Sequence, residues 1–79
     1  IDRYNEYIML ALRTNQGISL DHIAQQLNLI GQSHHYPHTR NQIQKYIDNH
    51  LLQTHNNRII ATQKGIHILN QIIEALMMD

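Results

Sequence analysis

The sequence predicts a mainly α-helical domain with a small β-hairpin, in the winged helix arrangement of a helix-turn-helix followed by a wing. Several segments space their apolar residues as amphipathic helices do. Two short extended runs flank His55-Asn56-Asn57, a pattern typical of a hairpin. The chain has 79 residues, which is enough for one small core. We therefore expect residues 1–79 to form a single domain, excised from a larger protein because the chain starts at Ile1 rather than Met.

The first helix is expected to start near Arg3 and to stop two to four residues before Gly17. Met9 and Leu10 lie off its core-facing stripe, so the helix is apolar around most of its circumference. Such a helix needs a second apolar surface besides its own core. The stripe itself consists of Tyr4, Tyr7, Ile8, Ala11 and Leu12.

The second helix follows a short extended piece at residues 18–19. Ser19 is placed as its N-cap, and Asp21 suits the positive end of the helix dipole. Helical spacing continues to Leu27. Residues 28–38, which contain Gly31 and Pro37, are expected to form the longest loop.

The third helix is expected to begin at Thr39, which forms a capping box with Gln42. Residues 51–54 and 58–61 form the hairpin strands, and Thr62 caps one final helix. The stripe of that last helix includes Ile66. The residues predicted to be buried are Ile8, Leu12, Ile23, Leu27, Ile43, Ile47, Ile60, Leu69, Ile72 and Leu76.

Composition argues against several classes of function. Lys+Arg and Asp+Glu both number 6, so the formal net charge is zero and lacks the positive excess usual in nucleic-acid binders. The absence of cysteine excludes disulfides and a thiolate-held cluster within these residues, and it fits a cytoplasmic location. No apolar run approaches the length of a membrane span, so we expect no membrane partner.

A histidine cluster suggests a metal or heme site, but the pattern favours solvated loop residues. His34, His35 and His38 surround Tyr36-Pro37 without cysteine or a carboxylate at ligand spacing. Zinc sites need three or four ligands in a fixed tetrahedron, and a flexible loop offers no such frame. We therefore predict no metal or cofactor site in this chain.

The outer face of the third helix is where a winged helix would contact DNA. Its polar residues could contact base edges, but its cations are too sparse to neutralise several phosphates. Nor do the serines and threonines form a nucleophile–base pair, so we expect no catalytic residue. The residues of that face are Arg40, Asn41, Gln44, Lys45 and Asp48; the acids Asp21, Asp48, Glu74 and Asp79 are read as surface charges.

The first helix resembles the opening of a known domain. Asn5-Glu6-Tyr7, Met9, Leu12-Arg13 and Gly17 are similar to the start of the C-terminal domain of oxygen-independent coproporphyrinogen III oxidases and of related heme chaperones. The resemblance implies a parent protein of porphyrin or heme metabolism, a radical SAM oxidoreductase or a heme carrier. That parent would hold a [4Fe-4S] cluster and S-adenosylmethionine in an N-terminal barrel, while this chain would be a non-catalytic cap.

The same resemblance implies a docking role for part of the first helix. Its partner would be the barrel of the parent protein, with porphyrinogen or heme reached through that parent. The expected docking residues are Asn5, Glu6, Tyr7, Met9, Leu10 and Arg13. The alternative is a free-standing winged helix that binds DNA or a protein.

Overall fold

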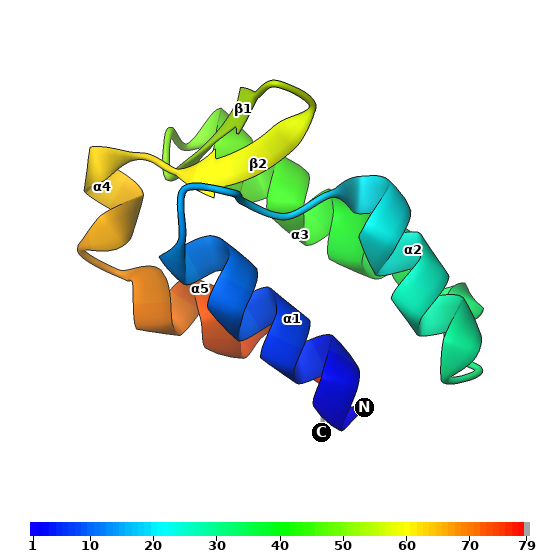
Figure 1. Cartoon of the computed structure of the whole chain (residues 1–79). Helices are drawn as coiled ribbons and strands as arrows, with labels where there is room; N and C mark the ends of the chain where they lie inside the picture. The colour runs from blue at the N-terminus through cyan, green and yellow to red at the C-terminus, as the bar shows by residue number, and fades with distance from the viewer. Residues whose placement is uncertain (79) are drawn as a thin grey trace.

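The computed structural model describes residues 1–78, so Asp79, expected on the surface, lies outside the described residues. It is mainly helical with one two-stranded antiparallel hairpin (Figure 1). The elements follow in the order α1 (Asp2–Arg13), α2 (Leu20–Leu29), the 3-10 helix η1 (Ser33–His35), α3 (Tyr36–Asp48), β1 (Leu52–His55), β2 (Arg58–Ala61), α4 (Gln63–Ile66) and α5 (Leu69–Leu76).

Helix α1 lies against both α5 and α2, and the two chain ends meet at one corner of the molecule (Figure 1). The buried side chains from all the larger elements form one core. They are Tyr4, Ile8, Ala11, Leu12, Ile18, Ile23, Leu27, Ile43, Leu52, Ile59, Ile72, Ile73 and Leu76.

Two of the predicted helix caps are confirmed. The Ser19 hydroxyl accepts a hydrogen bond from the backbone N–H of His22, at 3.3 Å. The Thr62 hydroxyl accepts one from Gly65, at 3.0 Å. Each cap satisfies an N–H that the first turn of a helix leaves without an intrahelical partner.

The predicted hairpin is also confirmed. Strand β1 pairs with β2 so that His55 faces Arg58, and Asn56 and Asn57 form the turn with φ of 50° and 63°. Asparagine tolerates this left-handed conformation, which matches the twist of the strands. Ile18 pairs with Ile59 of β2 in an isolated antiparallel bridge, in which its N–H and its carbonyl each bond to Ile59 at 2.8 Å.

Most of the predicted core is buried, but three predictions of burial are wrong. Ile60 is half-buried because side chains alternate along β2 and Ile59 takes the core-facing position. Ile47 and Leu69 are also half-buried and pack against the edge of the core. Those confirmed are Ile8, Leu12, Ile23, Leu27, Ile43, Ile72 and Leu76.

The long loop predicted for residues 28–38 is wrong. Helix α2 ends in a Schellman motif, in which the N–H of Gln32 bonds to the carbonyl of Leu27 and Gly31 adopts a φ of 71°. The chain turns at once into η1, which packs against both α2 and α3. Gly31 therefore ends α2 locally and does not begin a long loop.

The predicted start of the third helix at Thr39 is wrong as well. Helix α3 starts at Tyr36, with Pro37 in its first turn. The N–H groups of a first turn have no partner within the helix, so proline, which has no N–H, costs no hydrogen bond there. Thr39 is 1% exposed inside the helix, and its hydroxyl donates to the carbonyl of His35 at 3.4 Å. The residue therefore back-bonds to the preceding turn instead of capping.

The prediction of one final helix after Thr62 is wrong, because two helices, α4 and α5, lie between Thr62 and Met78. After α4 the N–H of Ile68 bonds to the carbonyl of Gly65, three residues back, and α5 then starts with a new orientation. Because this turn is tighter than an α-helical one, the side chains before it no longer face the same direction as those of α5. Ile66, predicted on the core stripe, is consequently 58% exposed.

Candidate functional site

Helix α1 carries all six of the predicted docking residues, which differ in their exposure. Glu6, Leu10 and Arg13 are exposed, while Asn5, Tyr7 and Met9 are half-buried. Their roles differ accordingly, because all of them except Glu6 and Leu10 already bond to or pack against other parts of this domain.

Asn5 binds the C-terminal end of the chain. Its side-chain oxygen accepts a hydrogen bond from the N–H of Met78 at 2.7 Å, and its side-chain nitrogen donates to the Met78 carbonyl at 2.5 Å. The Asn5 side-chain amide therefore pairs with both the N–H and the carbonyl of Met78, as the backbone of a neighbouring β-strand would. It ties the segment after α5 to the first turns of α1.

Tyr7 positions the start of α2. Its hydroxyl accepts a hydrogen bond from the N–H of Ser19 at 2.8 Å. Its ring lies 4.3 Å from the His22 ring, centroid to centroid, at an angle of 50°. This contact fixes the distance between α1 and α2 at one end of their shared surface.

Met9, Leu10 and Arg13 complete the set. Met9 packs against the domain's own core, whereas the Leu10 side chain is 54% exposed. Arg13 donates from its guanidinium to the side-chain oxygen of Asn70 at 2.8 Å, so it links α1 to α5. Leu10 is the large apolar residue that α1 leaves in water.

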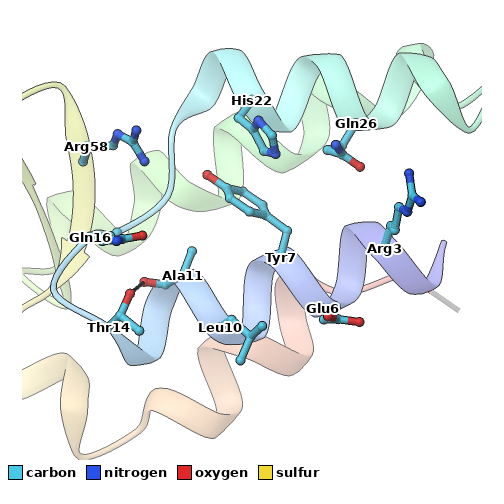
Figure 2. Close-up of a pocket in the computed structure, with 11 residues that line it drawn as sticks. Arg3, Glu6, Tyr7, Leu10, Ala11, Thr14, Gln16, His22, Gln26 and Arg58 are labelled. Carbon is cyan, nitrogen blue, oxygen red and sulfur yellow. Dashed lines mark hydrogen bonds between the residues drawn. The ribbon is translucent and has the colours of Figure 1, made fainter.

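A groove of about 320 Å³ lies between α1 and α2, beside the Arg58 end of β2 (Figure 2). Figure 2 shows Tyr7 and His22 at its centre, with Arg58 and Arg3 at opposite ends. The other lining residues are Glu6, Leu10, Ala11, Thr14, Gln16, Gly17 and Gln26.

Sequence reasoning did not find this groove as a site. Arg3, His22 and Arg58 come from three elements, and no sequence spacing relates them. The bond from Tyr7 to Ser19 and the pairing of Ile18 with Ile59 bring those elements together. The one available signal was Tyr7, which lies on the stripe but carries a hydroxyl that needs a polar partner.

The histidine cluster lies elsewhere, at the junction of η1 and α3. The rings of His35 and His38 are 5.0 Å apart, centroid to centroid. Burial lowers the pKa of His35, and the nearby imidazoles of His38 and His34 lower it further. Among residues 1–78, no three His, Asp or Glu side chains converge in a way that could hold a metal ion.

Fold and site together define a small helical domain with a hairpin, organised around a first helix that packs on two sides. The chain belongs to the HemN C-terminal domain family, whose model matches residues 1–68. This confirms the predicted resemblance to the C-terminal domain of the HemN-type coproporphyrinogen oxidases of the radical SAM class. Curated proteins and solved structures yielded no match. No helix within residues 1–78 has both the length and the apolar character to cross a bilayer.

Proposed function

We propose that this chain is the C-terminal cap of a radical SAM coproporphyrinogen III oxidase or heme chaperone, lying against the barrel of its parent protein. The family match over residues 1–68 carries this proposal. The cap supplies no catalytic residue. The [4Fe-4S] cluster and S-adenosylmethionine belong to the N-terminal domain of the parent, since the described residues contain no cysteine to ligate a cluster.

The fold of the cap is a winged helix. The order of α1, the Ile18 bridge, α2, α3 and the β1–β2 hairpin supports this assignment. In this arrangement the hairpin is the wing. Ile18, which pairs with Ile59, occupies the position of the first strand of the small sheet. The domain packs through α1 and leaves α3 outside the contact with the barrel.

The docking face is the exposed side of α1, where Glu6 and Leu10 lie one turn apart. Leu10 provides apolar area that the barrel would remove from water. Asn5, Tyr7 and Arg13 act behind this face, because their hydrogen bonds hold α1 against the rest of the domain. Met9 supports the face from the core side.

Substitution of Leu10 by Ser in the whole parent protein tests the docking face. We expect the free energy of unfolding of the domain to change by about half a kcal/mol or less, as for most surface changes. Loss of cap docking should reduce coproporphyrinogen turnover, or heme binding if the parent is a chaperone. The double change of Met9 and Leu10 to Ser should reduce it further.

Leu29→Ser is the matched control. Leu29 is 68% exposed at the far end of α2, so the same chemical change is made away from α1. The control should leave turnover and heme binding unchanged. Equal activity of the Leu10→Ser and Leu29→Ser proteins would exclude α1 as the docking face.

A further inference from the structure

The groove between α1 and α2 has a cation at each end and an apolar, aromatic middle. Arg58 lies at one end and Arg3 at the other, with Tyr7 between them (Figure 2). The volume of about 320 Å³ is in the range of small-molecule sites. Along α1 the groove extends from Arg3 to Thr14, about 16 Å at a rise of 1.5 Å per residue.

The two guanidinium groups are available to a ligand. Within residues 1–78 the arginine that bonds to another side chain is Arg13, outside the groove. Two arginines and one acid, Glu6, line the groove, and Figure 2 shows the Glu6 side chain at the edge of α1 near Leu10, away from the Tyr7 ring. The open side of the groove therefore has an excess of positive charge, and guanidinium groups pair with carboxylates in a two-pronged geometry.

The Tyr7 hydroxyl adds a hydrogen-bond donor next to Arg58. Because its oxygen already accepts from the N–H of Ser19, the hydroxyl hydrogen remains free to donate. A second cavity of about 390 Å³ shares Tyr7, His22 and Arg58 with the groove and adds Asp21. Asp21 lines the second cavity and not the groove, and no ion pair joins it to Arg58 among residues 1–78.

We propose that this groove binds an elongated organic dicarboxylate with an apolar body. One carboxylate pairs with Arg58 and accepts from the Tyr7 hydroxyl, the body lies across the Tyr7 ring and Ala11, and the second carboxylate pairs with Arg3. Small Ala11 leaves room for the body where a larger side chain would fill the groove. The groove adjoins the proposed docking face at Glu6 and Leu10, but Arg3, Arg58 and the Tyr7 hydroxyl lie outside that face, so ligand binding goes beyond the proposed function.

Titration of the 79-residue chain with decanedioate tests the proposal, with binding followed by the NMR signals of Tyr7 and His22. We expect these signals to shift on saturation. Arg58→Gln and Arg3→Gln should each weaken binding about fivefold, the effect of about 1 kcal/mol from one lost charge-assisted contact. Arg40→Gln, an exposed arginine on α3, should change the affinity less than twofold.

Two probes of the same chain length, one with a single carboxylate and one with none, decide between this site and simple apolar adsorption. Decanoate should bind more weakly than decanedioate and should lose its sensitivity to one of the two arginine substitutions. 1,10-Decanediol should not bind measurably. Equal binding of the diol, or unchanged affinity in both groove variants whose circular dichroism matches the parent chain, would overturn the proposal and leave the cap function unaffected.

Discussion

The hydroxyl of Tyr4 donates a hydrogen bond to the carbonyl oxygen of Leu76, 3.0 Å away, across 72 positions of sequence. The Tyr4 side chain is fully buried, so this bond crosses the core and joins the start of α1 to the end of α5. Burial raises the pKa of Tyr4, because the phenolate is disfavoured there, and the nearby Thr39 side chain partly opposes the rise. The two ends of the chain are thus held together by a neutral phenol.

Replacing Tyr4 with Phe should destabilise the domain by about 1–2 kcal/mol, because it removes one buried hydrogen bond and leaves the Leu76 carbonyl with one partner fewer. Urea unfolding measures the change. Tyr46→Phe is the control, since Tyr46 is half-buried and its hydroxyl makes no hydrogen bond to the residues described. A Tyr4→Phe protein as stable as the control would show that the bond contributes nothing.

Asn5→Ala should free the segment after α5 without unfolding the core. Both hydrogen bonds to Met78 are lost, while the buried apolar contacts of α1 are retained. Amide hydrogen exchange at Met78 should therefore accelerate much more than exchange at Ile8. Unchanged protection at Met78 would mean that other contacts hold this segment.

Helix α3 ends in a second Schellman motif, in which the N–H of Leu51 bonds to the carbonyl of Tyr46 at 2.8 Å. Glycine is favoured at the left-handed position of both motifs, so adding it to one and removing it from the other should change stability in opposite directions. His50 ends α3 with a φ of 63°, where a glycine fits without strain, so His50→Gly should stabilise the domain by about 0.5–1 kcal/mol. Gly31 ends α2 with a φ of 71° and open space around its Cα, so Gly31→Ala should cost about 1 kcal/mol from backbone strain alone. Thermal unfolding of both variants tests the pair, and a shift of the same sign in both would contradict it.

The lowered pKa of His35 predicts acid sensitivity. The folded state binds the His35 proton less tightly than the unfolded state, so stability is full above the ordinary histidine pKa of about 6.5 and falls as the pH drops through the folded value. His35→Gln should reduce the fall in melting temperature between pH 7.5 and pH 5. His67→Gln, an exposed histidine after α4, should not.

The polar outer face of α3 tests the alternative function, a free-standing winged helix that binds DNA. Arg40, Lys45 and Asp48 give it little net charge, so we expect a shift assay with random duplex to detect no binding tighter than about micromolar at physiological salt. Tight binding that Lys45→Gln weakens would favour a free-standing DNA-binding winged helix over a cap.

Features that depend on neighbouring residues followed from the sequence alone. The Ser19 and Thr62 caps and the Asn56-Asn57 turn each satisfy backbone groups within a few positions, so residue type and spacing were enough to predict them. The periodicity of α1 likewise identified its core-facing side. Family membership rested on a string within this one helix, which the match over residues 1–68 confirmed.

Tertiary packing decided the rest, because the responsible partners are distant in sequence. The start of α3 depends on η1 packing against α2, and the exposure of Ile66 follows from the tight turn that separates α4 from α5. The pairing of the Asn5 amide with Met78 joins residues at opposite ends of the chain, so no local pattern predicts it. The groove requires side chains from α1, α2 and β2, and only the folded core brings Arg3, Tyr7 and Arg58 to one surface.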